Sequence, residues 1–205
     1  MDMTQFHDCS ESFARDLEGF SPPVELTGTT SIYCLSPDFR LAAYDDGWVS
    51  FARENGGDLR KLGLGVSVMD TVPVILRDFY RRVYSHCLET GDVWCHHYQC
   101  SSPSDFRVFE EIVIGMPERQ GLVIAHQLQM QMPQPNAVEY PEEAKFVNPL
   151  TEAIGQCAHC RRVVDPHHRR WVLMPEWVRH RPGNIQDDLC PACYVSTYRN
   201  VGLTA

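Results

Sequence analysis

The chain of 205 residues is long enough to bury a hydrophobic core, and its 43% apolar and 22% charged content is that of a globular protein. The formal net charge of −9 is uneven, because residues 1–130 hold 19 acidic and 10 basic side chains whereas residues 131–205 hold 8 of each. The acidic balance of the first part argues against nucleic acid or an anionic membrane as its partner.

The first twenty residues carry scattered acidic side chains and no apolar run, so they do not form a secretory signal. No stretch of the sequence approaches a membrane span, so no membrane partner is expected. We therefore expect a cytoplasmic protein. In that compartment the nine cysteines are expected to be thiols or metal ligands rather than disulfides.

The N-terminal segment, residues 1–24, carries apolar side chains at intervals of three and four. This spacing predicts one amphipathic helix that ends at Ser21-Pro22-Pro23. Its apolar face either packs on its own domain or also builds a homodimer contact, and both interpretations stay open. The apolar positions are Phe6, Cys9, Phe13, Leu17 and Phe20.

The next hundred residues predict an α+β domain. Two short strands are followed by a short helix, a long helix with Pro73 in its first turn, and three strands separated by turns. Apolar side chains occupy both faces of the last strands, so helices are expected on one face and another element on the other. The expected bounds are 30–35 and 40–44 for the first strands, Trp48 to Glu54 and 72–90 for the helices, and 93–100, 106–115 and 121–128 for the last strands.

This order of elements resembles a PAS domain over residues 25–130. The phrases that carry the resemblance are FRLAAYDDGWVSFARENGG, LGVSVMDTVPVILRDFY, LETGDVWCHHYQCSSPSDFRVF and GLVIAHQL. The resemblance implies a five-stranded antiparallel sheet with flanking helices that enclose a cavity for a small ligand. It also implies a sensory role, a signalling partner, and a homodimer formed through this half of the chain.

The cavity of such a domain would lie between the long helix and the inner face of the sheet. The choice of strand residues is uncertain by one position, and a shift by one residue would exchange the faces. The expected lining residues are Trp48, Phe51, Phe79, Val83, His97 and Phe109.

Two departures limit the cofactors that the resemblance implies. The region Gly65 to Met69 lacks the cysteine that bonds flavin covalently in light-sensing PAS domains. Tyr80 stands near the position at which haem-binding relatives have a histidine, and His86 lies later in the helix. A small unidentified ligand is therefore expected, with a redox or haem sensor as the lesser alternative.

After a proline-rich linker at residues 131–153, two C-x-x-C pairs are separated by 29 residues. Four thiolates at about 2.3 Å complete the tetrahedral shell of a structural zinc site. A rubredoxin-like iron site commonly has glycine after each pair, where this chain has Arg161 and Tyr194. A thioredoxin-type pair would need a neighbouring βαβ pattern. The predicted zinc ligands are Cys157, Cys160, Cys190 and Cys193.

The C-terminal module, residues 154–205, resembles a treble-clef zinc finger and the cysteine modules that follow PAS domains in some bacterial signalling proteins. The phrases CAHCRRV and LCPACYVSTY carry this resemblance. A strand is expected near Trp171 to Leu173, a short helix near Glu176 to Val178, and a helix from Cys190 to Tyr198. The helix would begin with Pro191 at its first position.

The sequence thus predicts a bacterial-type signalling protein rather than an enzyme, since it has no phosphate-binding glycine loop, no nucleophile elbow and no metal site with an open position. The alternative is a nucleic-acid-binding regulator. Residues 157–205 hold seven Lys or Arg against four Asp or Glu, an excess that can meet phosphates. A charge cluster of this size is usually a solvated face.

Overall fold

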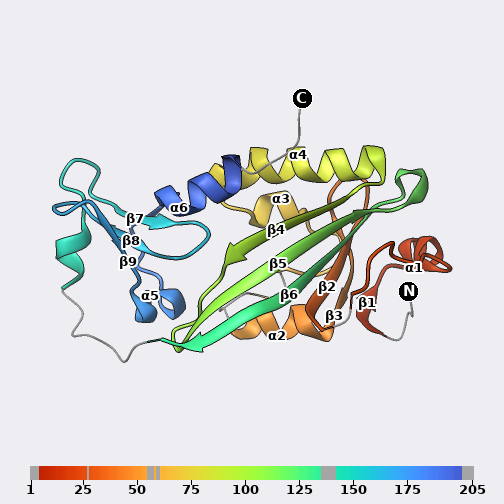
Figure 1. The fold of residues 1–205 in the computed structure, drawn as a ribbon, viewed down its shortest axis with the longest axis horizontal. Coiled ribbons are helices and arrows are strands. Elements are labelled where there is room, and N and C mark those ends of the chain that lie inside the picture. The colour runs from red at the N-terminus through yellow and green to blue at the C-terminus, as the bar shows by residue number, and fades with distance from the viewer. Residues whose placement is uncertain (1–4, 27, 55–57, 59–60, 135–141, 200–205) are drawn as a thin grey trace. The chain divides into compact units, whose positions relative to one another are not determined.

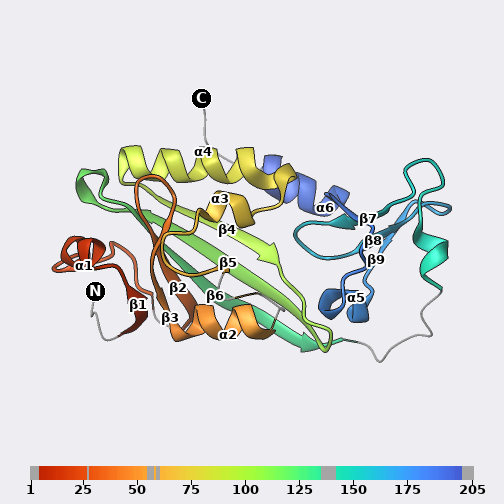
Figure 2. The same cartoon turned by 180° about the vertical axis from the view of Figure 1, so that it is seen from behind.

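The structure, a computed structural model, describes residues 5–26, 28–54, 58, 61–134 and 142–199 (Figures 1 and 2). The chain divides into two compact units. The first comprises Met1–Val72, Arg77–His96 and Glu110–Leu128, and the second comprises Pro73–Leu76, His97–Phe109 and Gln129–Ala205.

A six-stranded antiparallel sheet forms the larger of two sheets, where five strands were expected. Its strand order is β1-β3-β2-β6-β5-β4. Because β2 pairs with both β3 and β6, the first hairpin and the last three strands meet at the centre of the sheet. The strands are β1 (Phe6–Cys9), β2 (Thr29–Leu35), β3 (Leu41–Asp45), β4 (Val93–Gln99), β5 (Asp105–Gly115) and β6 (Leu122–Pro133).

The additional strand corrects the expected N-terminal helix. Phe6–Cys9 pairs with the edge strand β3, and only Glu11–Leu17 form a helix, α1. The spacing of Phe6 and Cys9 fits a helix, but pairing with β3 satisfies the backbone of this segment and overrides the pattern. The later positions behave as expected, since Phe13 and Leu17 are buried.

The connection between β3 and β4 holds the helices α2 (Asp46–Glu54), α3 (Val68–Thr71) and α4 (Val74–Thr90). The expected short and long helices are confirmed, and α3 is an addition. Pro73 directly precedes α4, whose last residue comes just before Gly91 in a left-handed conformation. The buried side chains of α4 recur at intervals of one to four residues, so one stripe of the helix faces the core: Leu76, Phe79, Val83, Tyr84 and Cys87.

Side chains from the two faces of the large sheet enter two different cores. Ile112 and Ile114 of β5 belong to the cluster that Phe13 and Leu17 of α1 cover. Their neighbours Glu111 and Val113 point to the opposite face, because side chains alternate along a strand. There Glu111 of β5 meets Tyr84 of α4. The expectation of apolar side chains on both faces is therefore confirmed, with α1 on one face and α4 on the other.

The second unit contains a four-stranded sheet of order β10-β7-β8-β9. β7 and β8 are antiparallel, whereas β10 runs parallel to β7. A small core fills this unit, and its buried residues are Phe146, Ile154, Val163 and Met174. The elements are η4 (Glu143–Phe146), β7 (Ile154–Cys157), β8 (Val163–Asp165), β9 (Arg170–Val172), α5 (Pro175–Arg179), β10 (Ile185–Asp188), α6 (Pro191–Tyr194) and η5 (Val195–Arg199).

The expected linker and C-terminal helix both differ in detail from the prediction. β6 continues to Pro133 and η4 forms within the linker range, while residues 135–141 lie outside the described residues. The C-terminal helix is an α-helical turn, α6, that continues as the π-helical turn η5. The strand at Trp171 and the helix at Trp177 are present as β9 and α5.

Candidate metal centre

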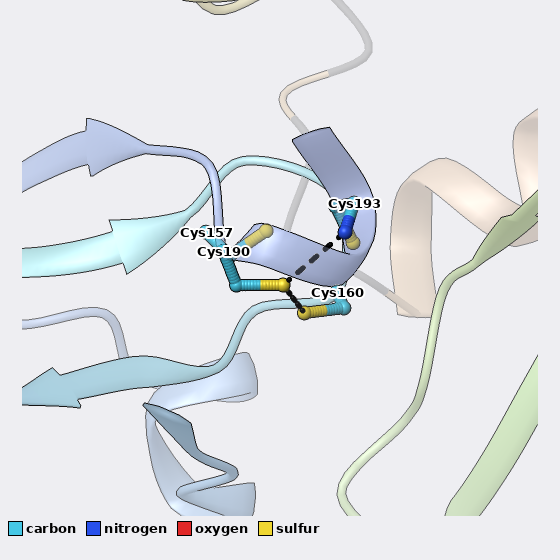
Figure 3. Close-up of side chains that lie close together, drawn as sticks. All are labelled: Cys157, Cys160, Cys190 and Cys193. Atoms are coloured by element: carbon cyan, nitrogen blue, oxygen red, sulfur yellow. Dashed lines mark hydrogen bonds between the residues drawn. The ribbon is translucent and has the colours of Figure 1, made fainter. Parts of the chain in front are cut away.

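The four predicted ligand cysteines converge at one point of the second unit (Figure 3). Cys157 is the last residue of β7, and Cys160 lies in the turn before β8. Cys190 is the N-cap of α6, and Cys193 lies in its single turn. All four Sγ atoms are within 4.8 Å of one another, so this group can hold a metal ion.

The spacing of the sulfur atoms fits a tetrahedral ion. Sγ of Cys160 lies 3.7 Å from Sγ of Cys190. Four ligands at about 2.3 Å from a tetrahedral zinc ion are about 3.8 Å from one another. A disulfide would bring the two sulfur atoms to about 2.05 Å. The geometry therefore corresponds to a shared metal rather than to a covalent bond.

Backbone hydrogen bonds shape the turn that presents the first pair. The N–H of Arg161 donates to the Cys157 carbonyl at 3.0 Å, and the Cys157 N–H donates to the Arg162 carbonyl at 2.7 Å. Arg161 has a φ of 63°, in the left-handed region. The N–H of Ala158 bonds the carbonyl of Asp188 at 2.8 Å, which ties this turn to the chain leading into Cys190.

The second pair is placed by α6. Cys190 caps the helix, and its sulfur accepts the N–H of Cys193 at 3.5 Å. Pro191 at the first helical position is preorganised for this turn and leaves no backbone donor unsatisfied there. A C-x-x-C pair in one turn of helix thus points both sulfur atoms to the same side.

Hydrogen bonds among the four thiols lower the pKa of Cys157 and Cys190 and raise the pKa of Cys160 and Cys193. Hydrogen bonding with its neighbours, Cys160 first, lowers the pKa of Cys157 to about 6. Hydrogen bonds from the other three thiols, Cys157 first, also hold the pKa of Cys190 well below its usual range. Since metal ions bind thiolates, a lowered pKa favours metal binding at neutral pH.

The cluster is enclosed by protein. Cys157, Cys160 and Cys190 are buried and Cys193 is half-buried. His159, between the first two cysteines, is also buried, and its Nε2 lies 3.0 Å from Oγ1 of Thr197 in η5. Four sulfur ligands leave a tetrahedral ion no open position for water or substrate. The site can therefore stabilise this unit, but it lacks the open position that a catalytic metal requires.

The basic residues of the module serve partly as internal contacts. Arg162 donates to Oε1 of Gln99 at 2.8 Å, and Arg181 pairs with Asp187. Arg169, in the turn before β9, and Arg170, the first residue of β9, are exposed. The spare histidines His167, His168 and His180 are exposed as well, and none belongs to the four-cysteine group.

The predicted pocket residues fall into two groups. Phe79, Val83 and Phe109 are buried and Trp48 is half-buried, whereas Phe51 and His97 are exposed. α2 buries Val49 and Ala52 in place of Phe51. The strand β4 buries His96, whose ring lies 5.8 Å from that of Phe79. Because side chains alternate along β4, the structure exchanges His97 for its neighbour.

Sequence reasoning missed a polar group in the interior of the first unit. Glu111 is only 2% exposed, and its Oε1 accepts a hydrogen bond from the hydroxyl of Tyr84 at 3.3 Å. The signal was present in the sequence, because Glu111 occupies the same face of β5 as the apolar Phe109 and Val113. A charged residue in such an alternation indicates either a face exposed to solvent or a buried functional group.

Comparisons of the chain with protein-family models, with curated proteins and with solved structures find no match. Among the residues that the structure describes, no helix combines the length and apolar character needed to cross a membrane.

Proposed function

We propose that the protein is a signalling protein that acts by binding rather than by catalysis. Its first part would be a PAS sensory domain that binds a small ligand or a partner protein. Its C-terminal module, held together by a structural zinc ion, would anchor or relay the response. Two observations carry this proposal together: the closed group of four cysteines in one unit and, in the other, a sheet of the connectivity described above.

The connectivity supports the PAS assignment. Leaving β1 aside, the sheet has the order β3-β2-β6-β5-β4, and the helices α2, α3 and α4 lie between β3 and β4. The order of elements on which the sequence resemblance rests is thus retained in three dimensions. α4 packs its buried stripe on one face of this sheet, where a PAS ligand would bind.

The closed cysteine shell supports zinc and a structural role. Zinc accepts four thiolates without geometric preference from its d electrons, and sites of this type stabilise small modules outright. Among the described residues, the buried apolar cluster apart from the cysteines is small and consists of Phe146, Ile154, Val163 and Met174. Such a core contributes little stability, so the metal is expected to be required for folding.

The zinc assignment is tested with Cys160→Ser in the full chain. This variant should lose bound zinc, and amide exchange in β7 to β10 should become fast while β2 and β6 stay protected. Cys95→Ser is the matched control, because Cys95 is exposed and outside the cluster. If Cys160→Ser retains full zinc occupancy and an intact module, the four-cysteine site is refuted.

Self-association through the first part belongs to the same proposal. α1 and its neighbours cover the cluster around Ile112 and Ile114. Further along the same face Cys95 is exposed and Glu110 is half-buried. A second copy that packs on this strip, with α1 at the contact, would form the homodimer. A nucleic-acid partner has less support, since Arg162 is engaged with Gln99 and Arg181 with Asp187.

A further inference from the structure

A buried carboxyl group in the first unit has one oxygen without a partner. Glu111 lies on β5, and its Oε1 accepts from the hydroxyl of Tyr84, which in turn lies 3.3 Å from the hydroxyl of Tyr33. Within the described part of the chain, Oε2 of Glu111 is the buried side-chain nitrogen or oxygen atom that has no hydrogen-bond partner. Buried polar atoms are nearly always paired, so this oxygen marks a missing group.

Neither protonation state of Glu111 satisfies Oε2. A carboxylate oxygen needs a donor there, and a protonated oxygen needs an acceptor. Burial raises the pKa of Glu111 to about 7, and only hydrogen bonds from Tyr84 and Tyr80 act in the opposite direction. No lysine or arginine of the described residues contributes to this pKa. The carboxyl group thus lacks the cation that usually accompanies a buried acid.

Aromatic rings pack around the two tyrosines whose hydroxyls lead to Glu111. The ring of Tyr33 lies 4.7 Å from that of Trp48 and 5.7 Å from that of His126. The ring of Tyr84 lies 5.8 Å from that of Phe39. Aromatic faces attract cations, most strongly where water is excluded. The arrangement therefore combines an acceptor oxygen with ring faces that favour positive charge.

The titratable neighbours of Glu111 supply no positive charge of their own. They come from α4, β2 and β6. Burial of its ring lowers the pKa of His126 to about 4, so this imidazole is neutral at neutral pH. Burial raises the pKa of the Cys87 thiol to about 12 and that of the Tyr33 hydroxyl above its usual range, so both are neutral as well. Among the residues that the structure describes, none of these neighbours supplies a positive charge to Glu111, so we look for that charge in a bound ligand.

We propose that this interior is a binding subsite for a small protonated nitrogen base, whose N–H group donates to Oε2 of Glu111 beside the aromatic cluster of Tyr33, Tyr84 and Trp48. The inference rests on the proposed ligand-binding role of the first unit and specifies its ligand class. It separates amines and amidines from carboxylates and neutral alcohols, because only the cation both donates to Oε2 and compensates the charge of the buried carboxylate.

The test uses three probes of similar shape, benzylammonium, benzyl alcohol and benzoate, titrated into the full zinc-loaded chain near pH 8. Benzylammonium should bind saturably and raise the melting temperature of the first unit. Glu111→Gln, which keeps the shape of the side chain, should weaken this binding by about tenfold or more, since hydrogen bonds to charged groups are strong. Glu110→Gln removes the same charge from the adjacent position of β5 and should leave binding unchanged.

Tyr84→Phe gives a second readout that does not remove the carboxylate. It deletes the hydroxyl that donates to Oε1 of Glu111 but retains the ring, so benzylammonium should still bind. Circular dichroism of each variant establishes that the first unit is folded. A folded Glu111→Gln that binds benzylammonium as tightly as the wild type would overturn the inference.

The probes also separate this inference from the broader function. If the folded wild type binds benzyl alcohol or benzoate but not benzylammonium, the ligand-binding role stands and the inference is refuted. If none of the three binds and a crystal structure shows a water molecule on Oε2 in a filled interior, both the subsite and the ligand-binding role are refuted.

Discussion

Replacing Glu111 by glutamine should make the stability of the first unit less dependent on pH. Burial raises the pKa of this carboxyl group in the folded chain to about 7 from its ordinary value of 4.5. Between these two values the folded chain holds a proton that the unfolded chain has lost. The free energy of unfolding therefore falls as the pH rises, and the loss is complete above about pH 7.

The size of the effect follows from the shift. A change of one pKa unit corresponds to about 1.4 kcal/mol, so the full loss is roughly 3 kcal/mol, of which about 2 kcal/mol falls between about pH 5.5 and about pH 8. Glu111→Gln has no proton to lose and escapes this penalty. At about pH 8 it should be more stable than the wild type, and the two should approach each other on acidification.

The assay is urea unfolding of wild type and Glu111→Gln across that pH range, without added ligand. Hydrogen exchange of β2 and β6 reports on the first unit separately from the zinc module. Groups that titrate in both proteins cancel when the unfolding free energy of the wild type is subtracted from that of Glu111→Gln. The variant Glu110→Gln controls for the loss of a negative charge. A difference in unfolding free energy that stays constant from acidic to basic pH would refute the assignment of a buried, mostly uncharged Glu111.

Three further predictions concern the fold and its assembly. Thr197→Val removes the hydrogen bond between the buried side chains of Thr197 and His159. This variant should release zinc to a chelator faster, and its C-terminal module should be less stable by about 1 kcal/mol. Thr197→Ser keeps the hydroxyl and should behave as the wild type. Gly115→Ala would place a Cβ against the carbonyl oxygen of Cys87. Urea unfolding should show a free energy of unfolding lower by about 1–3 kcal/mol. An unchanged midpoint of urea unfolding would contradict the close approach of α4 to β5. Deletion of residues 1–20 uncovers the cluster around Ile112, so it should destabilise the first unit and weaken dimerisation measured by sedimentation. A wild-type chain that sediments as a monomer at micromolar concentration would reject the dimer.

Local sequence signals predicted most elements of the large sheet. Pro73 and Gly91 bracket α4, and turn residues separate the strands, so their positions depend on nearby residues alone. The strand at Phe6–Cys9 could not be found in this way. It exists because β3 offers a free edge, and Cys9 pairs with Ala43 across more than thirty residues of sequence. An apolar spacing of three matched a helix equally well.

The candidate sites show the same contrast between local sequence signals and contacts of distant residues. C-x-x-C spacing constrains a pair of ligands locally, and the two pairs predicted the group of four cysteines that the structure brings together. Whether His96 or His97 is buried depends on which face of β4 meets α4. A shift of the strand register by one residue exchanges the two faces. Glu111 required its distant partners Tyr84 and Tyr33, which the topology of the sheet brings to it from other elements.

X-ray absorption at the zinc edge of the full chain, purified without added metal, tests the central claim most directly because it identifies the ion and its ligands together. We expect about one zinc per chain, with four sulfur ligands at about 2.3 Å. A folded chain without stoichiometric zinc, or a zinc shell that contains oxygen or nitrogen in place of a sulfur ligand, would contradict it.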